Sequence, residues 1–444
     1  MQTAIIGAGP TGLFLGAALA RRGHAVIIVD RDPGPESHGS WTRKGVMQFH
    51  HAHAFRRQAV EAVRREMPAA YDRMLAAGGE PISLTLPDGS ESLSGLRIRR
   101  QTFERALRET AVETPGLAIV VGHVEEVTAT AGHADGLLVS GAQLPADLVI
   151  DASGRSGRAT RALREAPTAG GDCGIAYVDR QFQLNEGAEP GPLINPLAWQ
   201  GNFDGYQVLI FVHERGIFSV LIIRGTDNRD LVELRSDTAF DAACRAIPGV
   251  DIWTEPERSR PITPTLAGGT LMNYYRSQRG PHGNLALPGL LFVGDSVCTT
   301  TPNFGRGIAL SMLQATEALR LIDEHGTDHV RIGEEFDAWC SANMLPWVQD
   351  HAHMDESLRR RWAGQDIDVA GRIPSDLIMA ASQVDPTIGK AITPYITMTG
   401  LPGCLDEVEP LARAVYAGGW RPPFSPGPTR RELVQVVGEA MKTA

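Results

Sequence analysis

The sequence predicts an α/β protein in which a parallel sheet, assembled from strand–helix–strand units, is interrupted by a second, antiparallel sheet. Three observations favour this architecture. The chain opens with a strand, a glycine turn, a helix and a second strand within its first 30 residues. Its middle part contains several strand-like runs of the kind found in antiparallel sheets. A buried strand of the parallel type then returns near residue 290, and the rest of the chain is mostly helical in pattern.

Composition narrows the class of protein. The 444 residues, 43% of them hydrophobic, are enough for two domains or for one large domain with insertions. The net charge of −10 disfavours nucleic acid as a partner, because an acidic surface repels phosphates. The five cysteines are scattered and form no CxxC pair, which fits a reducing cytosol. The first strand starts almost at Met1, and no apolar run approaches the roughly 20 residues that span a bilayer, so we expect a cytoplasmic protein without a signal peptide or an integral membrane segment.

The elements of the first half follow from the spacing of apolar residues and from glycine and proline. An apolar run ended by glycine is a buried strand, and apolar residues at helical spacing ended by Gly23 form a helix. The pattern from Phe55 to Ala77 is helical, with a break near Pro68. The run "PDGSES" predicts a hairpin, and "IRRQTFERALRETA" predicts an amphipathic helix. Several short strands then lead to the strongly apolar strand of "DLVIDASG".

These patterns divide the chain into three regions. We expect a discontinuous, Rossmann-like nucleotide-binding domain from residues 1–171 and 276–330. Residues 172–275, with strands in "YVDRQFQLN", "YQVLIFVHE" and "GIFSVLIIRG", form an inserted antiparallel-sheet domain for the substrate. Residues 331–444 form a helical C-terminal region that packs against both.

The first chemical motif is G-x-G-x-x-G, made by Gly7, Gly9 and Gly12 directly after a strand and at the start of a helix. The first glycine permits a tight turn, the second lets the backbone approach a pyrophosphate, and the third allows close packing of helix and sheet. Asp30 closes the second strand, where a carboxylate can bind a ribose. This segment predicts an adenine dinucleotide, and by itself it leaves NAD and FAD equally open.

The choice between the two cofactors comes from "LLFVGDSVCTTTPNFGRGIALSMLQATEALRLI". A buried strand ends at Gly294 and Asp295, and Gly305 and Gly307 precede a long helix after Pro302. An acid at a strand end can hydrogen-bond a ribityl chain, and the helix N-terminus can stabilise the negative charge of a reduced flavin. NAD(P) has neither feature, so this segment favours FAD. Asp151, at the carboxyl end of another strand, is expected to face the same crevice.

These motifs resemble those of the FAD-dependent group A monooxygenases, the p-hydroxybenzoate-hydroxylase-like family, over roughly the first three quarters of the chain. The resemblance lies in "GAGPTG" with Asp30, "IRRQTFERAL", "DLVIDASGRSGR" and "GDSVCTTTPNFGRG". Within that family the chain is most similar to the bacterial branch that contains polyether epoxidases, through "RKGVMQFHHAHAF" and the loop after Gly294.

The resemblance implies roles for individual residues. Arg43 and Arg100 would lie near the FAD, Val124 near the adenine and Asp295 on the ribityl chain. Gly307 and Ile308 would offer backbone N–H groups to the isoalloxazine. We expect the remainder of the cofactor site to include Pro10, Thr11, Arg31 and Gly154.

The resemblance also implies the reaction. NADPH or NADH would reduce FAD, O2 would add at flavin C4a, and the resulting hydroperoxide would hydroxylate or epoxidise a small hydrophobic organic substrate, such as an intermediate of secondary metabolism. The cofactor performs the difficult step, so no catalytic side chain is assigned. Alternatives remain open: reduced FAD supplied by a partner flavin reductase, reduction of a double bond without oxygen insertion, and a flavin-bearing protein without turnover. The Trp-x-Trp-x-Ile-Pro motif of flavin halogenases is absent, which disfavours halogenation.

Two departures from the family pattern affect these expectations. The Asp-Gly pair that often precedes the serine and arginine run is replaced by Ala152-Ser153-Gly154, so the mode of NAD(P)H binding is open. The small-residue/His pair after Gly-Asp is replaced by Ser296-Val297-Cys298, which favours the epoxidase branch.

The substrate pocket and the histidines are less clearly marked. Phe304 is the best pocket candidate because its loop should face the flavin ring, and Pro302, Tyr206, Phe218 and His53 are further candidates, although most strand aromatics are expected to lie in the core. The HHAH and HAH runs invite a metal hypothesis, but a spacing of two residues does not place both rings on one helix face. We therefore expect no metal site.

Overall fold

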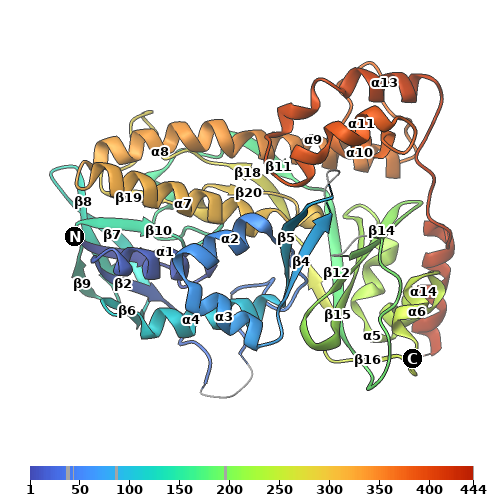
Figure 1. Cartoon of the computed structure of the whole chain (residues 1–444), viewed down its shortest axis with the longest axis horizontal. Helices are drawn as coiled ribbons and strands as arrows, with labels where there is room; N and C mark the ends of the chain where they lie inside the picture. Colours follow the sequence, from blue (N-terminus) through green and yellow to red (C-terminus); the bar gives the residue numbers. More distant parts are fainter. Residues whose placement is uncertain (37–40, 44, 86–88, 195–197, 444) are drawn as a thin grey trace.

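The computed structural model describes residues 1–36, 41–43, 45–85, 89–194 and 198–443. A five-stranded parallel sheet in the order β19-β10-β1-β2-β6 forms its nucleotide-binding half (Figure 1). Its strands are β1 (Gln2–Ile6), β2 (Ala25–Asp30), β6 (Leu117–Val121), β10 (Leu148–Asp151) and β19 (Leu290–Phe292). The order places β19, from the distant part of the chain, beside β10, so the discontinuous parallel sheet that the sequence predicts is confirmed.

The carboxyl ends of the central strands meet along one edge. Ile6 pairs with Asp151, and Asp151 pairs with Phe292 in parallel register. The glycine turn, the 152–160 loop and the segment after Val293 therefore leave the sheet side by side. In an open parallel sheet this edge is where ligands bind.

Helices cover this sheet. The helix α1 (Pro10–Arg21) is buried along nearly its whole length, because alanine and glycine let it lie close to the strands. The others are α2 (Arg57–Glu66), α3 (Pro68–Ala76), α4 (Arg100–Glu113), α7 (Gly307–His325) and α8 (His329–Asn343). The predicted helix break at Pro68 is confirmed, whereas Phe55–Arg56 forms a short strand, β3, in place of the first helical turn.

The inserted region is built on a six-stranded antiparallel sheet in the order β13-β14-β15-β12-β16, with β17 paired to β12. One face of this sheet packs on α5 (Asp237–Ala246), on α6 (Val250–Thr254) and on the C-terminal helix α14 (Arg430–Thr443). Its strands are β12 (Ile175–Leu184), β13 (Ala198–Phe203), β14 (Tyr206–Val212), β15 (Ile217–Gly225), β16 (Ser259–Pro261) and β17 (Leu266–Gly268). The opposite face turns toward the nucleotide-binding half.

Three small sheets complete the β-structure. One of them joins the two halves, because β11 (Ala169–Asp172) pairs with β18 (Met272–Tyr275), which pairs with β20 (Cys298–Thr299). The proposed domain limits at 171/172 and 275/276 fall on this strand pair. The other two sheets contain β3 with β4 (Glu80–Thr85) and β5 (Glu91–Arg97), and β7 (Val124–Thr130) with β8 (His133–Val139) and β9 (Ala142–Pro145). The strands on both sides of the predicted hairpin are present, and its residues 86–88 lie outside the described residues.

The C-terminal region is helical and contacts both halves. Helix α9 (Leu345–Trp362) packs on β11 and β18, and the short helices after it share the core of the parallel sheet. These are α10 (Ser375–Ala381), α11 (Pro386–Ala391), α12 (Thr393–Ile396) and α13 (Glu409–Ala417). A long connection then leads to α14 on the far side of the antiparallel sheet (Figure 1).

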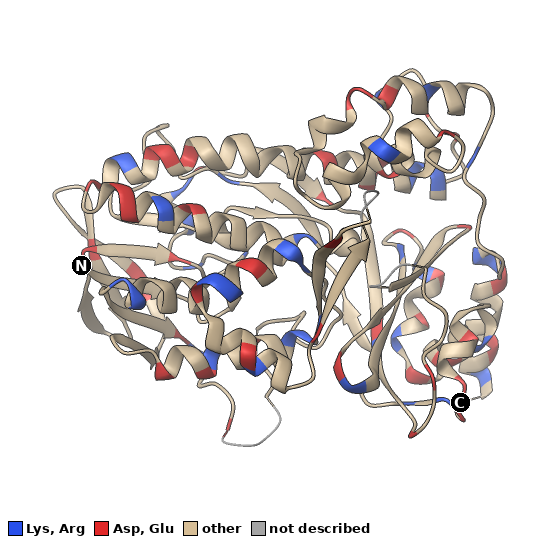
Figure 2. Cartoon of the chain, viewed as in Figure 1, with Lys and Arg blue, Asp and Glu red and all other residues tan. Residues whose placement is uncertain are grey.

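Acidic and basic residues are interspersed along the outer helices rather than gathered by sign (Figure 2). Within the described ranges, no helix is both long and apolar enough to cross a bilayer.

Candidate functional site

One large cavity of about 460 Å³ lies between the ligand-binding edge of the parallel sheet and the inner face of the antiparallel sheet. Its lining includes most of the residues that the sequence assigns to a cofactor. These are Gly7, Gly9, Pro10, Thr11, Asp30, Arg31, Arg43, Arg100, Val124, Gly154, Asp295, Pro302, Gly305, Gly307 and Ile308. Segments more than 250 residues apart in the sequence therefore meet in one site.

The glycine turn is built for close approach of a ligand. Gly7 has φ of +100°, and a Cβ there would lie 2.8 Å from the Ala152 carbonyl oxygen. A Cβ on Gly12 would lie only 1.9 Å from the Gly7 oxygen, so the start of α1 packs directly on the turn. Gly9 faces the cavity, and no side chain caps the N-terminus of α1. The first N–H groups of this helix are therefore available to a phosphate.

A second helix N-terminus opens into the same cavity. Helix α7 begins at Gly307 without a side-chain cap, and a Cβ on Gly307 would meet nothing within 4 Å. Thr300 Oγ1 and Asn303 Oδ1 are buried beside it without a hydrogen-bond partner among the described residues. Two helix N-termini at separate points of one cavity, with unpaired polar atoms beside the second, fit a dinucleotide whose far end carries a polar ring.

Asp295, which follows β19, lines the same cavity. Its side chain is open to the cavity but is enclosed by the protein, and burial raises the pKa of its carboxyl although Arg100 and Arg155 act in the opposite direction. A carboxyl in this place can accept hydrogen bonds from the hydroxyls of a sugar-like chain.

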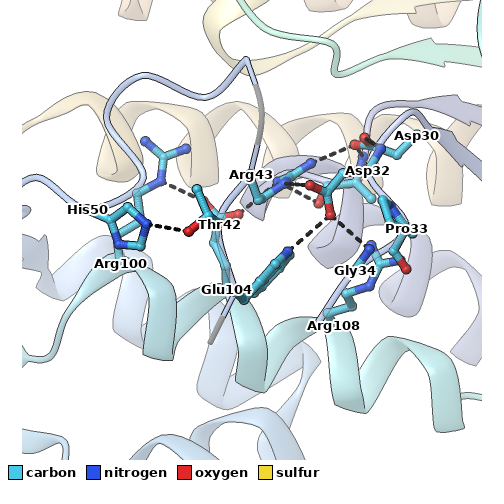
Figure 3. Close-up of polar contacts among 12 residues, drawn as sticks. Asp30, Asp32, Pro33, Gly34, Thr42, Arg43, His50, Arg100, Glu104 and Arg108 are labelled. Carbon is cyan, nitrogen blue, oxygen red and sulfur yellow. Dashed lines mark hydrogen bonds and ion pairs between the residues drawn. The ribbon is translucent and has the colours of Figure 1, made fainter. Parts of the chain in front are cut away.

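A chain of largely buried ion pairs links Asp30, Arg43, Glu104 and Arg100 (Figure 3). Arg43 donates to Asp30 Oδ2 at 2.7 Å and to Glu104 Oε2 at 2.8 Å, and Arg100 Nε donates to Glu104 Oε1 at 2.5 Å. Burial lowers the pKa of Arg43, but Glu104, Asp30 and Asp32 outweigh it and the net pKa is raised. Glu104 is fully buried and was missed by the sequence analysis, although "FERAL" places it one helical turn after Arg100.

His53 lines the cavity, as expected, but both of its ring nitrogens are engaged. Nδ1 lies 2.9 Å from the His51 carbonyl oxygen, and Nε2 lies 3.2 Å from Arg100 Nη1. Burial and the charge of Arg100 hold the pKa of His53 well below its ordinary value. The ring is therefore neutral and helps to orient Arg100.

Four predicted cofactor or pocket residues lie behind the cavity wall. The Asp151 carboxylate is buried and accepts from the Ser153 N–H and the Thr160 hydroxyl, so it shapes the 152–160 loop. The Gly294 N–H donates to Gln314 Oε1. Gly12 lets α1 pack directly on the glycine turn. The Phe304 ring turns away from the cavity and packs against His351 and Arg306, which corrects its assignment to the substrate pocket.

Tyr206 and Phe218 also do not line the cavity, which corrects their assignment to the substrate. Both lie in the core between the antiparallel sheet and α5. Side chains alternate between the two faces of a strand, and the apolar character of both faces hid which one is inner. The lining comes from the neighbouring positions of the same sheet: Tyr177, Leu209, Phe211, Leu221 and Ile223.

The loop before α7 is held by the C-terminal region. Arg306 is 1% exposed, donates to His351 Nε2 and to the Tyr395 hydroxyl at 3.0 Å each, and lies over the Trp347 ring. His351 is thus a partner of Arg306. Among the described residues, His, Cys, Asp and Glu form no group of three or more that could hold a metal ion.

Asp355, on α9, also supports the loop before α7. It accepts from Asn273 Nδ2 at 2.7 Å, and Asn273 Oδ1 accepts from the Thr301 N–H at 2.6 Å. Burial raises the pKa of Asp355 to about 7. An acid whose pKa is raised on folding stabilises the protein below pH 4, and this stabilisation is lost as the pH rises through 7.

Asp355→Asn is therefore expected to flatten the pH dependence of stability. Relative to the wild type, the Tm of the variant should rise from pH 4 to pH 7 and stay constant above pH 7, because the amide cannot ionise. Thermal melts of both proteins across this range measure the difference. Parallel curves would show that Asp355 does not titrate there.

The comparisons with known proteins concern the cofactor and the fold. The family model described as FAD dependent oxidoreductase matches residues 2–108. No curated protein matches the chain. Residues 2–108 are therefore similar to FAD-dependent oxidoreductases, which supports FAD as the cofactor.

Solved structures share the fold over most or all of the chain. The flavin-dependent brominase Bmp2 is 16% identical, with a TM-score of 0.60, over 100% of this chain and 99% of that one. The myxobacterial chondrochloren halogenase CndH is 16% identical with a TM-score of 0.60, over 99% and 96%. PqsL of Pseudomonas aeruginosa, a probable FAD-dependent monooxygenase, is 16% identical with a TM-score of 0.59, over 82% and 98%. The chain thus has the fold of FAD-dependent monooxygenases and halogenases.

Proposed function

We propose that this protein is an FAD-dependent monooxygenase that inserts one atom of O2 into a small hydrophobic organic substrate, by hydroxylation or epoxidation, with NADPH or NADH as electron donor. The observation that carries the proposal is one cavity lined on one side by the glycine turn and the N-terminus of α7, which suit a dinucleotide, and on the other side by an apolar sheet face. When bound, FAD supplies the activation of O2 and the transfer of one oxygen atom.

The residues of the chain would position the reactants. The N-terminus of α1 would hold the pyrophosphate, and Asp295 would hold the ribityl chain. The N–H groups at Gly307 and Ile308 would stabilise negative charge on the ring. Leu209 and Leu221 would exclude water from the reacting face.

The electron donor belongs to this proposal as well. Arg155 and Arg158 line the cavity from the exposed side of the 152–160 loop. Guanidinium groups at a cavity mouth suit the phosphates of NADPH or NADH. A partner flavin reductase is the alternative source of electrons.

Incubation of the holoenzyme with NADPH or NADH under ¹⁸O₂, in the presence of styrene, indole or naphthalene as probes, tests the proposal. The expected product carries one ¹⁸O atom, and NAD(P)H is consumed without a second protein. Product formation only after addition of a flavin reductase would assign the two-component form. Product formed without O2, or product brominated in a parallel reaction with bromide, would overturn oxygen insertion in favour of a reductase or a halogenase.

A further inference from the structure

We infer that the substrate of this cavity is a mainly apolar molecule with one neutral hydrogen-bond acceptor, and that the Tyr177 hydroxyl binds this acceptor. The inference deepens the proposed function, on which it rests, because it describes the substrate of that same site. No charged side chain comes from the antiparallel sheet to the cavity among the described residues, so a neutral acceptor, such as a ketone or ether oxygen, suits this wall.

The register of the sheet places Tyr177 among apolar neighbours. Tyr177 pairs with Ile223, and Leu221 pairs with Leu209, so these four side chains share the inner face. Leu271, which follows the sheet, extends the same surface. Among the described strands of this sheet, Tyr177 supplies a polar group to the cavity, and the other lining residues are apolar.

The Tyr177 hydroxyl has a proton to offer. Gln48 Nε2 donates to its oxygen at 3.1 Å, and no described residue accepts the proton of the hydroxyl. A phenol has one proton and two lone pairs, so the bond from Gln48 occupies a lone pair and leaves the proton free. Burial raises the pKa of Tyr177, which keeps the hydroxyl protonated at neutral pH. A ligand acceptor satisfies the donor that would otherwise stay unpaired.

The ring of Tyr177 is fixed before a ligand arrives. The residue is 4% exposed, and its ring packs flat against the backbone of Gly268, where a Cβ would lie 2.3 Å from Tyr177 Cζ. The edge of the His51 ring contacts it with 5.1 Å between ring centroids. His51 pairs with Asp179 behind the cavity wall, and neither lines the cavity. A hydroxyl held in this way binds an acceptor without a large loss of side-chain entropy.

Two probes that differ only in the acceptor test this inference: 2-acetylnaphthalene, a ketone, and 2-ethylnaphthalene, its hydrocarbon analogue. Binding is followed through the visible absorption of the bound FAD, without O2 or NADPH. We expect Tyr177→Phe to weaken binding of the ketone about 5-fold to 10-fold, the effect of one lost hydrogen bond, and to leave binding of the hydrocarbon within about 2-fold.

Tyr206→Phe is the matched control. Tyr206 lies on the outer face of the same sheet, where its hydroxyl donates to the Pro428 oxygen at 2.7 Å, so this variant should bind both probes as the wild type does. An equal loss for both probes in Tyr177→Phe, or a ketone affinity that does not change, overturns the inference, as does a wild type that does not bind the ketone. A protein that binds the ketone through Tyr177 but forms no ¹⁸O product retains the inference and loses the proposed reaction.

Discussion

The Gly307→Val variant is expected to fold and to lose FAD binding by about 3 kcal/mol, or roughly 100-fold, because two N–H contacts to the ring are blocked. A Cβ at this position meets no heavy atom within 4 Å apart from its chain neighbours and the backbone of its own helix, so a valine side chain fits the FAD-free protein. It would, however, project into the cavity at the point where α7 begins. Titration of the FAD-free protein with FAD, together with a thermal melt, measures both effects.

Gly438→Val is the control for this variant. Gly438 also lies in a helix, α14, and a Cβ there also meets nothing within 4 Å. It does not line the cavity, so FAD affinity should not change. If Gly307→Val binds FAD as tightly as the wild type, the N-terminus of α7 does not lie against the cofactor.

The Glu104→Leu variant is expected to lose about 3–5 kcal/mol of folding free energy, because it leaves the buried Arg43 and the half-buried Arg100 without their shared carboxylate. Arg43 and Arg100 both donate to Glu104, whose side chain is fully buried (Figure 3). Urea unfolding measures the loss. The same variant should bind FAD more weakly, since both arginines line the cavity.

Glu109→Leu on the same helix is the matched control. The Glu109 side chain is 46% exposed, and its ion pairs with Arg73 and Arg105 are 3.9 and 4.0 Å long. Exposed pairs of this kind contribute about 0–1 kcal/mol. Equal effects of the two substitutions would contradict the structural role assigned to the buried network.

The parts of the site that depend on local chemistry were predictable from the sequence. Gly7 and Gly9 are required by the turn itself, and Gly307 opens a long helix directly after a strand and a short loop. Such signals lie within a few neighbouring residues, and all three glycines line the cavity as expected. The Rossmann-like parallel sheet followed from the same local patterns.

The parts that depend on tertiary contacts were not predictable. Tyr206 and Phe218 were assigned to the pocket, but the inner face belongs to Leu209 and Leu221, because both faces of this sheet are buried and apolar. Asp151 lies at the expected edge, yet its carboxylate is taken up by its own loop. Contacts between distant segments of the chain determine which of these side chains line the cavity.

The contacts that hold the loop before α7 were also not predictable from the sequence. Arg306 precedes α7, but its partners His351 and Tyr395 come from the C-terminal helices, more than 40 residues away. The "HAH" run was therefore identified only as a doubtful metal motif. A buried arginine with aromatic neighbours leaves no periodic signal in one sequence.

The most direct test of the central claim is an equilibrium titration of the FAD-free protein with FAD, FMN and NAD⁺. The cavity joins the N-terminus of α1, the proposed pyrophosphate site, to the N-terminus of α7, the proposed ring site, so we expect tight binding to need both halves of FAD. We expect saturation at one FAD per chain, with much weaker binding of FMN, which lacks the adenylate half, and of NAD⁺, which lacks the ribityl chain and the flavin ring. A protein that takes up no FAD, or that binds NAD⁺ as tightly as FAD, would contradict the account.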